Sequence, residues 1–286
     1  MRGLVGRQKL LLAAVRELRR HRKYAQPKLH TAIMKTLFLL SREYDLGTVR
    51  PYAFFPYKFG PYSATAFGDL TYNLQRKGYL DENESLTPKG EAEIAGLDST
   101  SAKALSECVS RFKNDVQLLE YVYAKYPAYA VRSELKPQPP KMLEAAAFTI
   151  GYEGCDIDAF LDKLIQNDVQ ALVDVRNNPF SMNFAFVKSK LEKHLTKAGI
   201  EYRHVPELGI ESEKRKNLQT QGDYAELFDD YEKNTLPSQQ QALETIAGLG
   251  KEKRIALMCF EHDASNCHRG VIAKALRQRG MEVTDL

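Results

Sequence analysis

The pattern of apolar and polar positions divides the chain into two parts. In the first part, apolar residues recur every three or four positions, a period typical of amphipathic helices. This pattern predicts helices over residues 4–22, 29–44, 64–76 and 103–126. The aromatic, proline-containing residues 51–63 are predicted to form a loop. Two short apolar runs around the polar residues 81–84 indicate a β-hairpin, and Thr87-Pro88 begins a further helix.

In the second part, short apolar runs alternate with helical patterns. The predicted strands cover residues 146–150, 170–175, 201–205 and 254–260. The predicted helices cover residues 157–167, 187–198, 224–249 (with a break at 236–238) and 269–279, and residues 281–286 close the domain. Near-continuous apolar strands that alternate with helices indicate an α/β domain with a mostly parallel sheet flanked by helices.

The boundary between the two parts is a proline-rich segment. Residues 136–141 read KPQPPK and hold three of the twelve prolines in the chain. Proline fixes φ and lacks an N–H, so we expect an extended, semi-rigid spacer here. The sequence therefore predicts a mainly helical domain over residues 1–135, a linker over 136–146 and an α/β domain over 147–286.

The composition is that of a globular protein from a reducing compartment. Of the 286 residues, 43% are hydrophobic and 27% are charged, which excludes disordered and collagen-like chains. Apolar runs stay well short of the roughly 18 residues of a membrane helix, and the charged first twenty residues are unlike a secretory signal. Four cysteines are too few for a disulfide framework. We expect a cytoplasmic protein without a membrane partner.

The net charge of +4 hides an asymmetry between the two parts. Residues 1–140 contain 22 Lys and Arg against 14 Asp and Glu, a net charge of +8. Residues 141–286 contain 19 against 23, a net charge of −4. A basic domain favours a polyanionic partner such as DNA or RNA, and a solvated basic surface is the alternative interpretation.

The residues around the expected hairpin, KGYL and LTPKGEAEI, resemble the wing and the following helix of winged-helix modules. The resemblance implies that the helix over residues 64–76 is a recognition helix and that residues 81–84 form the tip of the wing. That tip is acidic, whereas a wing that contacts phosphates is basic, so protein interaction is the alternative role. The candidate nucleic-acid contacts are Arg19, Arg20, Lys58, Tyr62 and Arg76.

Polar residues and glycines follow each predicted strand of the second part. They read GYEG at 151–154, DVRNNP at 174–179, PELG at 206–209, CFEH at 259–262 and CHRG at 267–270. The carboxyl ends of parallel strands share one edge of a sheet, and ligands bind there. The sequence therefore predicts a site for a small anionic ligand or phosphate at this edge. The candidate binding residues are Tyr152, Glu153, Arg176, Asn177, Glu207, His268 and Arg269.

The same segments carry a family resemblance. The series TIGYEG, LVDVRNNPFS, GIEYRHVPELG, ALMCFE and CHRGVIAKAL resembles the bacterial and archaeal domain-of-unknown-function 488 family over residues 147–286. The resemblance implies the α/β fold and a site at the strand ends. It leaves the reaction open.

Carboxylates at the edge are candidates for proton transfer. Asp174 is the first candidate for a general base, and Glu261 and Glu153 are the next. A pair of carboxylates would allow one of them to act as an acid. The alternative is a structural network in which Asp174 pairs with Arg176 and Arg269.

Cysteine and histidine residues offer two further chemistries. Cys267 is predicted at a helix N-terminus beside His268 and Arg269, where a thiolate is favoured, so it is the candidate nucleophile. Cys259 is expected to be a buried apolar side chain. The set could also suit zinc or iron, but it lacks a C-x-x-C or H-x-x-x-H spacing, so no metal site is predicted. The residues of that set are Cys259, Glu261, His262, Cys267 and His268.

Together these features predict an enzyme that acts on a nucleic acid or a nucleotide. The basic domain would recruit the polyanion, Arg176 and Arg269 would hold a phosphate, and Asp174 or Glu261 would transfer a proton. One alternative is a DNA-binding regulator whose α/β domain senses a small anionic ligand. Another is a protein-interaction component of a toxin or defence system. The glycines lack the dinucleotide fingerprint, so NAD is not predicted and the cofactor stays unassigned.

Overall fold

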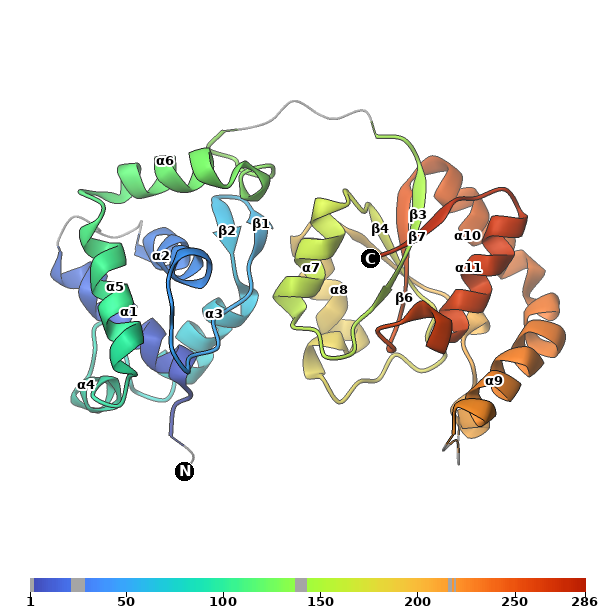
Figure 1. Cartoon of the computed structure of the whole chain (residues 1–286), viewed down its shortest axis with the longest axis horizontal. Coiled ribbons are helices and arrows are strands. Elements are labelled where there is room, and N and C mark those ends of the chain that lie inside the picture. Colours follow the sequence, from blue (N-terminus) through green and yellow to red (C-terminus); the bar gives the residue numbers. More distant parts are fainter. Residues whose placement is uncertain (1–2, 22–28, 137–142, 216–217, 219) are drawn as a thin grey trace. The chain divides into compact units, whose positions relative to one another are not determined.

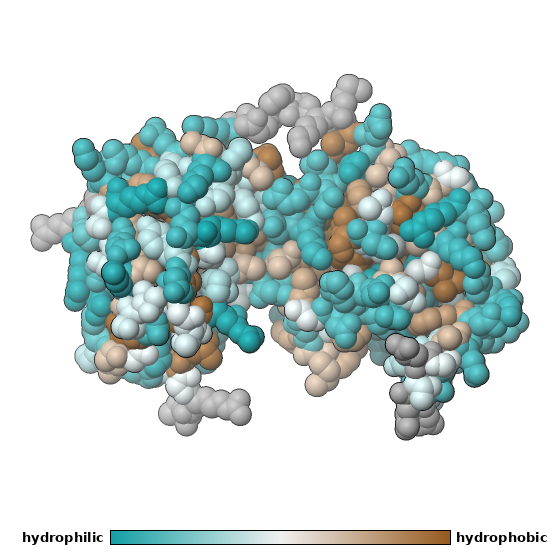
Figure 2. Space-filling model, viewed as in Figure 1, coloured by the Kyte–Doolittle hydropathy of each residue, from teal (hydrophilic) through white to brown (hydrophobic). Residues whose placement is uncertain are grey.

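The computed structural model describes residues 3–21, 29–136, 143–215, 218 and 220–286. The chain divides into two compact units, residues 1–139 and 140–286, and each unit has a hydrophobic core. The prolines of the predicted linker lie outside the described residues. On the face drawn in Figure 2, hydrophilic residues cover most of the surface of each unit.

The N-terminal unit is mainly helical (Figure 1). Its core is formed chiefly by α1 and α2, which also pack against α5. Its elements are α1 (Gly6–Arg20), α2 (Leu29–Glu43), β1 (Phe55–Tyr57), β2 (Gly60–Tyr62), α3 (Ala64–Gly68), the π-helix η1 (Asp69–Gln75), α4 (Pro88–Ile94), α5 (Ser99–Ser110), α6 (Asp115–Lys125) and the 3-10 helix η2 (Pro127–Tyr129).

The aromatic segment that was predicted as a loop contains a small hairpin. Strands β1 and β2 pair antiparallel, with Phe55 opposite Tyr62 and Tyr57 opposite Gly60. Gly60 has a φ of +96°, a value that favours glycine and permits the tight turn. The loop prediction was wrong here because proline and glycine mark turns without excluding two short strands beside the turn.

Three other predictions for this unit differ from the structure. The single helix predicted over residues 103–126 is two helices, α5 and α6, because Asn114 begins α6: its side chain accepts a hydrogen bond from the Gln117 N–H. The hairpin predicted around residues 81–84 is reduced to one antiparallel bridge between Leu80 and Leu86. The helix predicted over residues 64–76 is also divided, into α3 and the π-helix η1. The unit is therefore mainly helical as predicted, with one isolated bridge where a hairpin was expected.

The C-terminal unit is an α/β domain. Its strands are β3 (Ala146–Gly151), β4 (Ala171–Asp174), β5 (Glu201–His204), β6 (Arg254–Cys259) and β7 (Val283–Asp285). Its α-helices are α7 (Ile157–Gln166), α8 (Lys188–Lys197), α9 (Gln221–Asp230), α10 (Gln240–Glu252) and α11 (His268–Gln278). Shorter helices are η3 (Phe184–Phe186), η4 (Pro206–Leu208), η5 (Ser212–Arg215), η6 (Tyr231–Thr235), η7 (Leu236–Gln239) and η8 (Ala264–Asn266).

The five strands form one parallel sheet in the order β5-β4-β6-β3-β7. Helices α7 and α8 lie on one side of the sheet, and α10 and α11 lie on the other (Figure 1). The prediction of a parallel sheet flanked by helices is confirmed. Strand β6 lies between β4 and β3, so its last residue, Cys259, is in the middle of the carboxyl edge, beside Gly151 of β3.

The long helical stretch predicted over residues 224–249 is interrupted earlier than expected. Helix α9 ends at Asp230, and the chain continues through the π-helix η6 and the 3-10 helix η7 before α10 begins at Gln240. Pro237 lies in η7. Because proline lacks an N–H and crowds the preceding turn, the regular α-helix cannot run through this point.

Within the described ranges, each helix is too short or too polar to cross a membrane.

A buried lysine in α2 gives a prediction about stability. Lys35 is 1% exposed, and its amine donates a hydrogen bond to the Phe59 carbonyl. Burial lowers the pKa of Lys35 from 10.5 to about 7, so between these values the unfolded chain binds more protons and stability rises with pH. Lys35→Met lacks this proton linkage. At pH values below 7, the free energy of unfolding of this variant should exceed that of the wild type by about 3–5 kcal/mol. The difference should shrink as the pH rises toward 10.5.

Chemical denaturation of the full chain at several pH values measures this difference. Lys103→Met, at a side chain that is 80% exposed, is the matched control and should show no such trend. A difference for Lys35→Met that stays constant from pH 6 to pH 10 would contradict the account.

Candidate functional site

A pocket of about 380 Å³ opens at the carboxyl edge of the sheet. Its walls are formed by the segments that follow strands β3, β4, β5 and β6. Its polar lining residues are Tyr152, Arg176, Asn177, Asn178, Ser181, Asn183, Ser212 and Arg215. Its other lining residues are Gly154, Phe180, Met182, Ile210, Cys259 and Phe260. The edge at which the sequence predicts a site therefore carries a pocket.

An ion pair beneath the pocket fixes one of its two arginines. Strand β4 ends at Asp174, so the chain turns and Arg176 folds back onto the Asp174 carboxylate. Nε donates to Oδ1 at 2.8 Å, and Nη2 donates to Oδ2 at 2.6 Å. Asp174 also accepts hydrogen bonds from the Arg176 backbone N–H and from the Tyr202 hydroxyl. Asp174 is fully buried and its oxygens accept four donors, so its position suits an anchor for Arg176 more than a base that contacts a ligand.

Arg176 is held in one orientation by its neighbours. Its Nη1 donates to the Tyr152 hydroxyl at 2.9 Å, and its Nη2 donates to the Phe186 carbonyl at 3.1 Å. Among the described residues, these bonds and the two to Asp174 use four of the five N–H groups of the guanidinium. Burial by itself would lower the pKa of Arg176, but the Asp174 carboxylate outweighs it and raises that pKa. Arg176 thus presents a permanent positive charge and one remaining N–H at the pocket wall.

A second cluster lies at the centre of the edge and contains Cys259, Cys267 and His268. Cys259 ends β6, Cys267 is the N-cap residue of α11, and His268 is the first residue of that helix. All three are buried, and each sulfur lies 3.8 Å from His268 Nδ1. The other ring nitrogen, Nε2, donates to the Val175 carbonyl at 3.0 Å, so Nδ1 is the nitrogen that carries the lone pair in the neutral ring.

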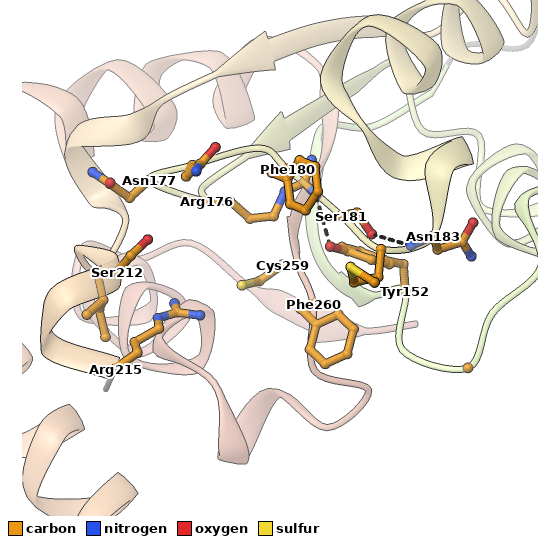
Figure 3. A pocket seen from close by; sticks show the side chains of 14 residues that line it. Tyr152, Arg176, Asn177, Phe180, Ser181, Asn183, Ser212, Arg215, Cys259 and Phe260 are labelled. Atoms are coloured by element: carbon orange, nitrogen blue, oxygen red, sulfur yellow. Dashed lines mark hydrogen bonds between the residues drawn. The ribbon is translucent and has the colours of Figure 1, made fainter. Parts of the chain in front are cut away.

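The second arginine of the pocket connects to this cluster. Arg215 Nη2 lies 3.1 Å from His268 Nδ1, and Arg215 Nη1 lies 3.8 Å from the Glu261 carboxylate. Figure 3 shows the Arg215 guanidinium and the Cys259 sulfur pointing toward each other across the pocket. Unlike Arg176, the Arg215 side chain is one-third exposed, which leaves it accessible to a ligand.

The two thiols differ in their ionisation. A hydrogen bond from Cys267 holds the pKa of Cys259 well below its ordinary value, and His268 and Arg215 lower it further against the effect of burial. Burial raises the pKa of Cys267, and the neighbouring Cys259 adds to the increase. The lower of the two pKa values belongs to Cys259, which lines the pocket. A nucleophilic role for Cys267 stays a prediction.

Glu261 lies beside the sulfurs. Burial raises the pKa of its carboxyl group, and the negative Cys259 sulfur raises it further. Its Oε2 is buried and makes no hydrogen bond within the described part of the chain. Such a carboxyl group can exchange a proton with a ligand or bind a cation.

The rim of the pocket carries large apolar side chains that are exposed to solvent. Phe180 is 64% exposed, Met182 is 94% exposed and Phe260 is 44% exposed. Phe180 and Met182 lie in the loop after β4, and Phe260 directly follows β6 (Figure 3). Exposed apolar groups around a polar pocket are typical of a surface that a ligand covers.

The remaining residues predicted for the edge have supporting positions. Both terminal nitrogens of the buried Arg269 donate to loop carbonyls, those of Glu261 and His262, so this guanidinium holds the loop after β6. The Glu153 carboxylate accepts the His262 backbone N–H. Asn177 lines the pocket, whereas Glu207 lines a neighbouring hollow of about 210 Å³.

The predicted nucleic-acid contacts of the N-terminal unit make contacts within that unit. Arg19 donates to the Asn83 carbonyl and to Ser85, at the tip of the expected wing. The other four are engaged as follows: Arg20 with Glu17, Lys58 with Glu134, Tyr62 with the rings of Phe55, Tyr57 and Phe67, and Arg76 with the ring of Tyr72. Arg20, Lys58 and Arg76 remain exposed, so a polyanion can still reach them.

Sequence reasoning missed Arg215 and undervalued Cys259. Arg215 lies in a run of charged residues after η4, without a strand end to mark it. Cys259 ends an apolar strand and is buried as predicted, but its contact with Cys267 joins positions eight residues apart and arises only on folding. The signal that could have indicated it is the presence of a second cysteine and a histidine at the start of the next helix.

Comparison with known proteins finds a match, which covers part of the C-terminal unit. Residues 156–276 match the family model of the domain of unknown function DUF488. The match begins just after Tyr152 and ends within α11, so it includes Asp174, Arg176 and the Cys259–Cys267–His268 cluster. No curated protein and no solved structure matched the chain.

Proposed function

We propose that the protein is an enzyme that acts on nucleotides or nucleic acid and binds its substrate in the pocket at the carboxyl edge of the α/β unit. The observation that carries the proposal is the combination of two guanidinium groups, a row of amide and hydroxyl groups, and exposed aromatic rings around one pocket. A volume of about 380 Å³ is within the common range for small-molecule sites, about 300–1,000 Å³.

The two arginines suit a phosphate group. Arg176 is pre-positioned by Asp174 and offers one N–H, while Arg215 approaches from η5 with a partly exposed guanidinium. Guanidinium groups bind phosphate oxygens through short, charge-assisted hydrogen bonds. Ser212 and Asn177 on the same wall could complete the set of donors.

The rim suits a planar base. Phe180 and Phe260 are exposed at the pocket, and a base that stacks on such a ring gains about 1–3 kcal/mol. The Cys259 side of the pocket would then face the bond to be cleaved or the atom to be attacked.

The N-terminal unit would recruit a polymeric substrate. Its excess of eight positive charges over residues 1–140 attracts a phosphate backbone, and the exposed Arg20, Lys58 and Arg76 are candidate contacts. The winged-helix resemblance is part of this proposal. If the recruitment is electrostatic, the affinity of the full chain for a single strand should fall steeply with salt.

Arg215→Gln is expected to weaken binding of a 5′-phosphorylated mononucleotide to the full chain by about 10- to 100-fold. The reason is the loss of a charge-assisted hydrogen bond worth about 1.5–3 kcal/mol. Equilibrium dialysis or calorimetric titration measures the affinity. Arg279→Gln removes the same charge at the end of α11 and should change the affinity less than twofold.

Two outcomes would overturn the proposal. One is the failure of mononucleotides and short single strands to bind the folded wild-type chain at millimolar concentration. The other is an equal loss of affinity in Arg215→Gln and Arg279→Gln. Tight binding without turnover of any nucleotide or strand would instead favour the regulator interpretation, in which the pocket senses its ligand.

A further inference from the structure

We propose that Cys259, Cys267 and His268 bind a zinc ion at the floor of the pocket. The inference deepens the proposed function, on which it rests for its catalytic meaning, because the ion would lie where the nucleotide is expected to react. Zinc binding itself can be tested without any nucleotide. It requires neither an electron acceptor nor a covalent step.

The three ligand atoms have a spacing that suits tetrahedral coordination. The Cys259 Sγ, Cys267 Sγ and His268 Nδ1 atoms all lie within 4.8 Å of one another, and each sulfur is 3.8 Å from Nδ1. Zinc bonds of about 2.3 Å to sulfur and about 2.0–2.1 Å to nitrogen at tetrahedral angles place sulfur and nitrogen roughly 3.6 Å apart. A shift of a few tenths of an ångström would therefore suffice for each sulfur–nitrogen pair. The two sulfurs, which lie within 4.8 Å of each other, would close to roughly 3.8 Å in a tetrahedral site.

The histidine is oriented as zinc ligands usually are. Its Nε2–H donates to the Val175 carbonyl at 3.0 Å, so the Nδ1 lone pair faces the two sulfurs. A backbone carbonyl on the far nitrogen fixes both the ring orientation and the tautomer of a metal-binding histidine. The ring is fully buried, which restricts it to this orientation.

The ligands come from rigid elements rather than from a flexible loop. Cys259 is the last residue of the central strand β6, and Cys267 and His268 begin α11. The intervening loop is tied down by Arg269, which donates to the carbonyls of residues 261 and 262. A site built on such elements keeps its geometry when the ion leaves.

A fourth coordination position has a suitable neighbour. The Glu261 carboxyl group lies beside the two cysteines, and its buried Oε2 lacks a hydrogen-bond partner among the described residues. Catalytic zinc sites combine three protein ligands with one open position. Because Cys259 lines the pocket, that position would face the bound substrate, and Glu261 could either complete the coordination or hold a proton beside it.

The chemistry of the set selects the metal. Two thiolates and an imidazole favour zinc over magnesium or calcium, which prefer oxygen ligands. Arg215 also contacts the nitrogen that would bind zinc, because its Nη2 lies 3.1 Å from His268 Nδ1. A guanidinium and a metal ion cannot both use Nδ1, so zinc would displace Arg215 toward the pocket, where the phosphate is expected.

Zinc titration of the metal-free full chain, in competition with a chromophoric chelator, tests the proposal. The wild type should bind one zinc ion per chain. Cys267→Ser should weaken that binding at least 100-fold, since even the loss of an outer partner of a ligand costs about 10–100-fold. The control Cys155→Ser, at a half-buried cysteine outside the cluster, should leave zinc affinity unchanged. Arg215→Gln should bind zinc as tightly as the wild type or more tightly, although it should bind nucleotide more weakly.

Cobalt substitution provides a readout that does not depend on a variant folding. The wild type loaded with Co²⁺ should show a thiolate-to-cobalt charge-transfer band, and Cys259→Ser/Cys267→Ser should lose it. A folded wild-type chain that binds less than stoichiometric zinc would overturn the metal proposal, as would a double variant that binds zinc as tightly as the wild type. If the wild-type chain binds nucleotide but no zinc, only the zinc proposal is refuted. If it binds zinc but no nucleotide, only the proposed function is refuted.

Discussion

Asp174→Asn is expected to lower the free energy of unfolding of the α/β unit by about 3–5 kcal/mol. Asp174 is fully buried, and Arg176 is only 5% exposed. Replacing the carboxylate leaves the guanidinium charge buried without its partner, which is the costly way to break a buried ion pair. The new amide N–H₂ would also face the Arg176 and Tyr202 donors instead of accepting from them.

Calorimetry of the full chain measures this effect. The transition of the α/β unit should shift down by roughly 10 °C, since 1 kcal/mol corresponds to about 2–4 °C in a domain near 150 residues. Tyr202→Phe is the control, because it removes one donor to Asp174 and should cost only about 1 kcal/mol. A loss for Asp174→Asn no larger than that for Tyr202→Phe would mean that the carboxylate does not anchor Arg176.

Gly151→Ala should also lower the free energy of unfolding, because the added methyl group would clash with the backbone. A Cβ at Gly151 would lie 1.9 Å from the Glu261 carbonyl oxygen and 2.9 Å from the His262 Cα. Both contacts are with backbone, so the loop after β6 must move, and overpacking of this kind costs about 1–3 kcal/mol or more. The shift would also displace Glu261 and Phe260, so nucleotide binding should fall with stability.

Gly248→Ala is the matched control for this substitution. Gly248 lies within α10, and an added Cβ there would meet nothing within 4 Å. Alanine is favoured over glycine in a helix by about 0.5–1 kcal/mol, so this variant should be more stable than the wild type. Chemical denaturation of the full chain compares the two. The close approach of β3 to the loop would be refuted if Gly151→Ala were as stable as Gly248→Ala.

The α/β class of the C-terminal unit could be predicted because its signals are local, although the short edge strand β7 was not predicted. Apolar runs bounded by turn residues predicted four strands, and the polar residues after them were expected at one edge. The structure places Asp174, Cys259 and Gly151 at that edge. Asn177-Asn178-Pro179 marked the end of β4, which is why Asp174 and Arg176 can meet although they are only two residues apart.

The other parts of the site depend on tertiary contacts that no local pattern encodes. The carboxylate with the best predicted position, Asp174, accepts four hydrogen bonds from two residues, Arg176 and Tyr202. The guanidinium that faces the pocket belongs to Arg215 rather than to Arg269, whose two terminal nitrogens donate to loop carbonyls. No local pattern in the sequence distinguishes the roles of these two arginines, because their different contacts arise only when the chain folds.

The N-terminal unit illustrates the opposite limit. Its helices were predicted from their period, but proline and glycine concealed the β1–β2 hairpin, and the tip of the expected wing is bonded to α1 through Arg19. A short bridge between Leu80 and Leu86 satisfies the same apolar pattern as a longer hairpin. Strand length in such a case is set by packing against the helices rather than by the residues of the strand.

Photo-crosslinking of the full chain with an azido-substituted mononucleotide tests directly whether the nucleotide binds at the carboxyl edge of the sheet. We expect to recover the label on peptides that contain Phe180 or Phe260, and we expect excess unmodified nucleotide to suppress the labelling. Recovery of the label from the N-terminal unit, or labelling that competing nucleotide leaves unchanged, would contradict the claim that the edge of the sheet is the substrate site.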